Sequence, residues 1–130
     1  MIKLNDIRVD NYILFKPFGK GKGKIGQIKP GDFGRIAGDD PENSEYHPIP
    51  LTSVWFKRLG FTKKETSTIW MLAIDYIGTD YPCTLQLSGS GIQVCRSGIG
   101  AACAPVFHVH QLQNLYYSLT GNELKVKEFA

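Results

Sequence analysis

The chain contains few cysteines and no long apolar run. Its three cysteines, Cys83, Cys95 and Cys103, are odd in number and widely spaced among 130 residues, a pattern typical of reduced thiols rather than of a disulfide framework. No apolar segment approaches the roughly 20 residues that cross a bilayer, and the first residues lack the apolar core of a secretory signal. We therefore expect a cytoplasmic protein without a membrane anchor.

Motifs that mark enzymes and metal sites are also missing. The sequence has no C-x-x-C pair, no HExxH and no glycine-flanked serine elbow. Cys103 with His108 or His110 is the only pair of thiol and imidazole close in sequence. Either these histidines join two thiols at a zinc ion, or the cysteines fill gaps in a sheet while the histidines precede the last helix. We favour the second hypothesis, and expect no metal, no cofactor and no enzyme.

Composition and charge indicate an ordinary globular protein with an uneven charge distribution. Apolar residues make up 42% and charged residues 21%, close to the globular average, and the length fits one domain over residues 1–130. The net charge of +3 is the sum of an uneven distribution, with +5 in residues 1–36 and −3 in residues 39–81. Part of the negative charge lies in the polar segment 38–45, which has the composition of a solvated loop. This asymmetry favours either an anion-binding face or a contact between subunits of a homo-oligomer.

The N-terminal third predicts short strands separated by glycine-rich turns. Residues 11–16 are rich in β-formers, residues 25–29 form a second candidate strand, and residues 33–37 are expected to pair back after a Pro-Gly turn. Short strands interrupted by glycine favour a small twisted antiparallel sheet, of which a partial SH3-like barrel is one form.

Two helices and a hairpin are expected in the remainder. Thr52 is a suitable N-cap for a helix over residues 53–59, with Gly60 at its end, and its aromatic residues should be buried because so short a helix is unstable alone. The segment 69–77 predicts a central strand covered on both faces. The remaining elements are a hairpin of 84–87 with 92–96, a small-residue connection over 98–104, and an amphipathic C-terminal helix packed on the sheet. The expected class is α+β.

The lysine-rich segment 19–24 contains the beginning of a formal G-x-G-x-x-G match, which runs from Gly21 to Gly26. A dinucleotide fingerprint requires a helix after the glycines, whereas a β-rich segment follows here. Two interpretations remain: backbone amides and lysines that hold a phosphate, or a solvated hairpin tip.

The final helix carries a resemblance to a known group. The segment from His108 to Gly121, HVHQLQNLYYSLTG, resembles the end of an uncharacterised family of small proteins from Bacteroidetes and their bacteriophages, with the pattern H-x-LQNLYxxLTG. The segments Arg8–Ile13 and Ile49–Thr52 resemble other landmarks of that family. The family has no known activity. The resemblance implies a bacterial host cell and, by genomic analogy, a phage protein that sequesters a nucleotide-derived signal of host immunity.

Two function classes follow. The first is a non-catalytic binding protein for a small anionic, nucleotide-like ligand. The alternative is a nucleic-acid-binding or protein–protein adaptor module that uses the basic N-terminal sheet. The modest net charge argues against nucleic-acid binding within this alternative. The candidate ligand-binding residues are Lys20, Lys22, Lys24, Tyr46, His47, Tyr81, Arg96, His108 and His110.

Overall fold

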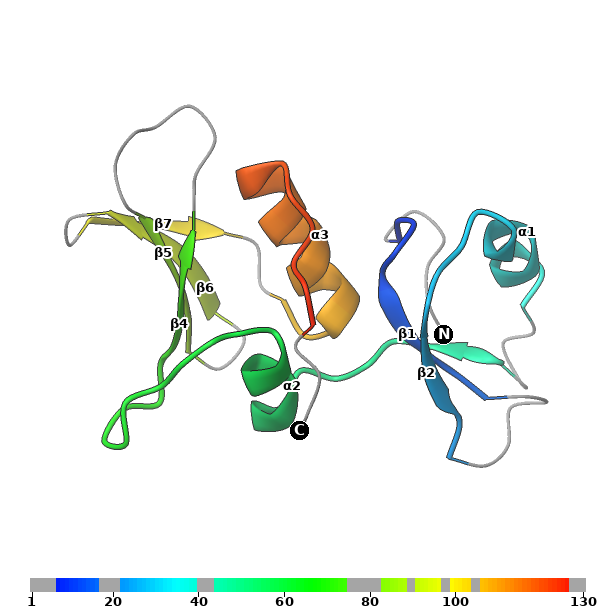
Figure 1. The fold of residues 1–130 in the computed structure, drawn as a ribbon, viewed down its shortest axis with the longest axis horizontal. Coiled ribbons are helices and arrows are strands. Elements are labelled where there is room, and N and C mark those ends of the chain that lie inside the picture. Colours follow the sequence, from blue (N-terminus) through cyan, green and yellow to red (C-terminus); the bar gives the residue numbers. More distant parts are fainter. Residues whose placement is uncertain are drawn as a thin grey trace. The chain divides into compact units, whose positions relative to one another are not determined.

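The computed structural model describes residues 7–16, 22–39, 44–74, 83–88, 91–96, 99–103 and 106–126. Within them the chain is α+β, with two antiparallel sheets, a short middle helix and a C-terminal helix, which confirms the expected class (Figure 1). The helices are α1 (Asp32–Ala37), α2 (Ser53–Arg58) and α3 (Val109–Thr120). The strands are β1 (Tyr12–Phe15), β2 (Lys24–Gln27), β3 (Tyr46–His47), β4 (Trp70–Ile74), β5 (Cys83–Ser88), β6 (Gly91–Arg96) and β7 (Ile99–Cys103).

Contacts between residues group the chain into two compact units. The first comprises residues 1–50 and 108–114, and the second comprises residues 51–107 and 115–130. Helix α3 therefore contributes its first residues to one unit and the rest to the other. The expectation of a single domain over the whole chain stays a prediction.

The first unit is built on a three-stranded sheet in the order β2-β1-β3, with both pairs antiparallel. Strand β1 lies in the middle because its apolar residues suit a position paired on both sides. Ile13, Ile28, Ile36 and Tyr46 form the buried core of this unit. The strands predicted over 11–16 and 25–29 are thus confirmed, with β2 beginning one residue earlier.

Residues 33–37, predicted as a strand that pairs back, form helix α1 instead. Phe33 and Ile36 lie three residues apart, which places them on the same face of a helix but on opposite faces of a strand. Both pack into the same core cluster. The carboxylate of Asp32 also accepts a hydrogen bond from the Lys29 amide at 2.8 Å, which fixes the turn before the helix. Tertiary packing therefore decides the conformation of this short segment.

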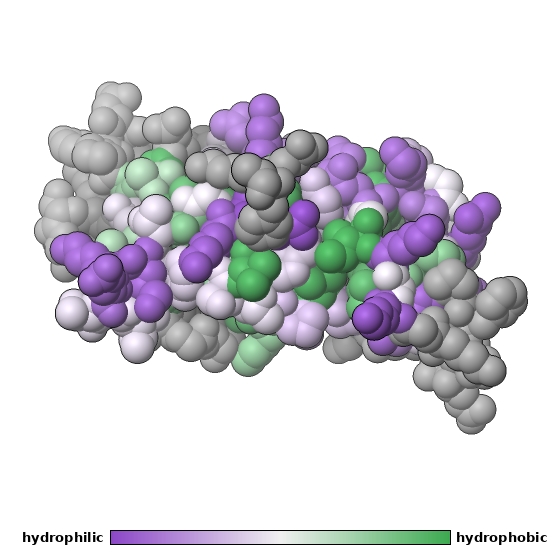
Figure 2. Space-filling view, turned by 60° about the horizontal axis from the view of Figure 1, so that its bottom comes forward, coloured by the Kyte–Doolittle hydropathy of each residue, from purple (hydrophilic) through white to green (hydrophobic). Residues whose placement is uncertain are grey.

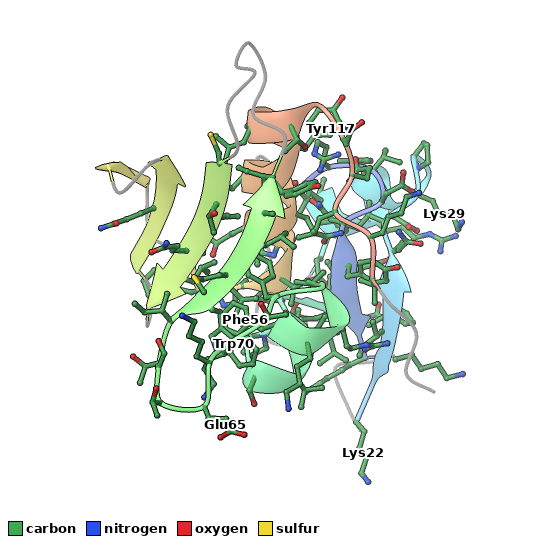
Figure 3. The ribbon with its side chains drawn as sticks, turned by 60° about the vertical axis from the view of Figure 1, so that its left-hand side comes forward. Lys22, Lys29, Phe56, Glu65, Trp70 and Tyr117 are labelled. Atoms are coloured by element: carbon green, nitrogen blue, oxygen red, sulfur yellow. The ribbon has the colours of Figure 1, made fainter. Side chains whose placement is uncertain are left out.

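In the second unit, helix α2 has the expected ends. The Trp55 amide donates to the Thr52 hydroxyl at 3.4 Å, which confirms the N-cap. Gly60 has a φ of 89°, and the Phe61 ring lies 5.7 Å from that of Phe56 at an edge-on angle. The ring of Trp70, the first residue of β4, stacks on the ring of Phe56, with the two ring centres 5.2 Å apart (Figure 3). The aromatic side chains of α2 are buried, as expected.

The four strands of the second sheet follow chain order, β4-β5-β6-β7, and are all antiparallel. The predicted hairpin is confirmed as β5 and β6. The expectation of a central strand over 69–77 was wrong: β4 lies at the edge of this sheet, and Ala73 is exposed. Successive hairpins place the first strand at an edge.

The predicted connection over 98–104 also proved to contain a strand, β7, although its residues are mostly small. The pairing of β7 with β6 satisfies the backbone of residues that have little intrinsic preference for a strand. Backbone hydrogen bonding to a formed neighbour therefore outweighs propensity here.

Helix α3 ends as predicted. Gly121 adopts a φ of 73° and its amide donates to the Tyr117 carbonyl at 2.8 Å, which is a left-handed C-cap. Leu112 is fully buried, while Leu115, Tyr116 and Leu119 are half-buried. No helix in the described part of the chain is both long and apolar enough to span a bilayer.

Candidate ligand-binding pocket

A pocket of about 520 Å³ lies in the first unit, between helix α1 and the end of the three-stranded sheet. Its volume falls within the range of small-molecule sites, roughly 300–1,000 Å³. It is lined by Phe15, Gly34, Arg35, Gly38, Asp39, Glu45 and Tyr46.

Strand register places three side chains in one row on this face of the sheet. Phe15 is directly opposite Lys24 on β2 and opposite Tyr46 on β3. Directly opposed residues in antiparallel strands point to the same face. The rings of Phe15 and Tyr46 lie 5.4 Å apart and are tilted by 52°. The row therefore carries an ammonium group beside a pair of aromatic rings that line the pocket.

Helix α1 supplies a cation and an open wall. Arg35 is exposed, and its guanidinium is hydrogen-bonded to the Tyr46 side chain. Gly34 and Gly38 lie four residues apart and so share one face of this segment, which therefore carries no side chains at these two positions. A Cβ at Gly34 would meet nothing within 4 Å, so this lining residue has open space beside it.

The environment of Tyr46 keeps its hydroxyl protonated. Burial raises the pKa of Tyr46, and the negative charges of Asp32 and Glu45 raise it further, whereas Arg35 opposes them. The hydroxyl thus remains neutral at physiological pH, as a hydrogen-bonding group at the edge of the pocket.

Asp39 organises the rim of the pocket. Its carboxylate accepts hydrogen bonds from the Ser44 hydroxyl, from the Glu45 amide at 2.9 Å and from the Tyr46 amide at 3.4 Å. Burial alone would raise the pKa of Asp39, but these hydrogen bonds and the nearby His47 together lower it. Asp39 therefore serves as the ionised anchor of the segment that leads into β3.

Among the lysines and tyrosines predicted from the sequence, the structure brings Lys24 and Tyr46 to one face. Lys22 lies just before β2 and extends into solvent (Figure 3). Tyr46 is only 7% exposed, so its ring is part of the core rather than a free stacking surface. Lys20 and Tyr81 lie outside the described residues, as does the side chain of Arg96.

The predicted histidines do not line the pocket. His47 follows Tyr46 on β3 and so points to the opposite face, where its Nε2 is 2.7 Å from the Ser44 carbonyl oxygen. His108 and His110 stack on each other with ring centres 5.8 Å apart, and His110 is buried. Cys83 is a buried thiol. No group of three metal-binding side chains occurs in the described part of the chain.

Sequence reasoning missed Phe15 and Arg35 as lining residues. The sequence predicts Phe15 only as part of a strand, and it predicts a strand around Arg35, where the structure has helix α1. The three-residue spacing of Phe33 and Ile36 is compatible with a helix, but only packing against the core selects it, and no local pattern places Arg35 beside Tyr46.

Compared with models of known protein families, with curated proteins and with solved structures, the chain matches none. The resemblance to small Bacteroidetes and phage proteins stays a prediction.

Proposed function

We propose that the protein is a non-catalytic binder of a small anionic, nucleotide-like ligand, held in the pocket between α1 and the three-stranded sheet. The observation that carries the proposal is the row of Lys24, Phe15 and Tyr46 across three strands, with Arg35 bonded to Tyr46 at the pocket. Two cations thus accompany an aromatic wall on one face.

The charges around the pocket favour a ligand with two kinds of group. Arg35 is suited to a phosphate because its planar guanidinium forms paired charge-assisted hydrogen bonds. Asp39 and Glu45 are also at the wall, and they would repel a bare polyanion. A ligand that combines an anionic group with hydroxyl or amino donors, as a nucleotide does, matches both.

Binding without conversion is the simplest chemistry for this set of side chains. Among the described residues that line the pocket there is no serine, cysteine, histidine or lysine. The Asp39 carboxylate is engaged by three hydrogen bonds and the Tyr46 hydroxyl stays protonated, so neither is activated as a nucleophile. The resemblance to phage proteins supplies a setting, in which the protein sequesters a nucleotide-derived immune signal of the host cell.

The test is a titration with linear and cyclic nucleotides, read by native mass spectrometry and calorimetry. Arg35→Gln should weaken binding at least about tenfold, because one charge-assisted pair is lost. Gly34→Leu should block the pocket, whereas Gly34→Ala should leave binding intact because its methyl group enters open space. Equal affinity in Arg35→Gln, Gly34→Leu and the parent protein, or no binding to any nucleotide, would refute the proposal.

A further inference from the structure

Strand β2 exposes a backbone edge. It stands at the end of the order β2-β1-β3, and within the described residues it pairs with β1 alone. All four of its residues are exposed, including Ile25 at 47%. An exposed strand edge is a template for pairing with another chain.

The hydrogen bonds of β1 show which groups face which neighbour. The Ile28 amide donates to the Asn11 carbonyl at 2.8 Å, and on the other side the Lys16 amide donates to the Glu45 carbonyl at 2.7 Å. Backbone groups alternate sides along an antiparallel strand. The backbone amide and carbonyl groups of odd-numbered residues of β1 therefore point toward β2, and those of even-numbered residues point toward β3.

On β2 the same alternation leaves two residues turned outward. Lys24 and Gly26 are opposite odd-numbered residues of β1, so their amide and carbonyl groups face inward. Ile25 and Gln27 consequently present their amide and carbonyl groups to the free edge, where no described backbone group meets them.

The charge along this edge is positive. Lys22, Lys24 and Lys29 are all exposed, and residues 22–29 include no acidic side chain. Lysines on an edge discourage pairing between identical strands, since like charges meet. An incoming strand that carries carboxylates would instead be attracted to this edge, because each lysine then gains an oppositely charged partner.

We propose that the free edge of β2 binds an extended acidic peptide segment as an additional strand. The amide and carbonyl groups of Ile25 and Gln27 supply the backbone hydrogen bonds. Lys22, Lys24 and Lys29, which precede, begin and follow this edge, favour an incoming strand that carries carboxylates. This is recognition by strand addition, in which backbone bonds give affinity and side chains give specificity. It shares Lys24 with the proposed nucleotide site, but its backbone hydrogen bonds lie on the edge of β2 and not in the pocket.

The experiment uses the whole protein and a short, capped peptide in which glutamate alternates with valine, measured by fluorescence anisotropy at low salt. Ile25→Pro removes the outward amide while leaving every β1–β2 hydrogen bond in place, because proline is tolerated where its nitrogen faces solvent. It should weaken binding about tenfold. Ile25→Val keeps the amide and should bind within about twofold of the parent.

A second probe separates backbone pairing from charge attraction. The same peptide with alternate amides methylated keeps its carboxylates but loses donors, and should also bind about tenfold more weakly. The proposal fails if the unmodified peptide does not bind, or if methylation and Ile25→Pro both leave its affinity unchanged. It also fails if Ile25→Pro instead converts a homodimer into monomers, because the edge then holds a second copy of the chain. A single-stranded oligonucleotide that displaces the peptide equally from the parent and from Ile25→Pro would likewise contradict it, because the peptide would then bind through charge rather than through the strand edge.

Discussion

The Gln113 side-chain oxygen accepts a hydrogen bond from the backbone amide of Tyr12 at 2.8 Å. The backbone amide of Tyr12 points toward the side of β1 on which β3 pairs, but β3 ends at His47 and is followed by Pro48. The buried Gln113 of α3 thus replaces a missing strand neighbour, and its amide nitrogen also approaches the Asp10 carbonyl at 3.4 Å. One helical side chain completes the sheet of the first unit.

This relationship predicts a large cost for a shape-conserving substitution. Gln113→Met should lower the free energy of unfolding by about 2 kcal/mol, because it leaves the Tyr12 amide without its acceptor. Gln27→Met is the matched control: Gln27 also donates to the Asp10 carbonyl, at 3.1 Å, but is exposed. It should change stability by less than about 0.5 kcal/mol. Urea denaturation of both variants measures the difference, and equal effects would contradict the assignment.

Two glycines, one just before β2 and one within it, should respond oppositely to alanine. Gly23 has a φ of 73°, and a Cβ there would lie 2.7 Å from the Phe15 carbonyl oxygen, whereas a Cβ at Gly26 meets nothing within 4 Å. Gly23→Ala should therefore lower the free energy of unfolding by about 1–2 kcal/mol or more. Gly26→Ala should be neutral or slightly stabilising. Thermal melting of the pair provides the measurement, and a harmless Gly23→Ala would show that this turn can rearrange.

The elements whose local signals agree with their packing could be predicted from the sequence. Thr52 and Gly60 bound α2 because capping depends on a few neighbouring residues, and the hairpin of β5 and β6 follows from two apolar runs around a Ser-Gly turn. Helix α1 could not be predicted in this way. Its glycine and short length give no local preference, and only the core around Ile36 fixes it.

The candidate site was predictable to the extent that it depends on strand residues. Lys24 and Tyr46 were named from the sequence, but their common row depends on register, which no local pattern specifies. The sequence predicts Asp39 only as part of the polar segment 38–45, whereas its carboxylate accepts three hydrogen bonds from the residues that follow it. Residues that act through long-range pairing carry no sequence signal of that role.

Asp39 should make stability depend on pH in the acid range. Its pKa is lowered in the folded state from the ordinary value of 3.8, so its contribution is present above that value and is lost as the pH falls through the lower folded pKa. Asp39→Asn should cost about 1–2 kcal/mol at neutral pH, and the difference from the parent should shrink below about pH 4. The exposed Glu65→Gln is the control, expected to match the parent at neutral pH. Urea melts across the pH range test this, and a constant gap between Asp39→Asn and the parent would contradict it.

Lys24 and Lys22 should differ in ligand binding although both are exposed lysines of the same segment. Lys24 stands in the row with Phe15 and Tyr46, so its ammonium group is on the pocket face, whereas Lys22 precedes the strand. Lys24→Gln should weaken nucleotide binding about threefold to tenfold and reduce the salt dependence of the affinity, because one charge near the ligand is lost.

Lys22→Gln is the matched control, since it removes the same charge from the protein without altering the row. Calorimetric titrations at low and high salt compare the two variants. Equal losses in both would mean that the ligand responds to the general positive charge of the N-terminal segment, and the row across the sheet would then have no special role in binding.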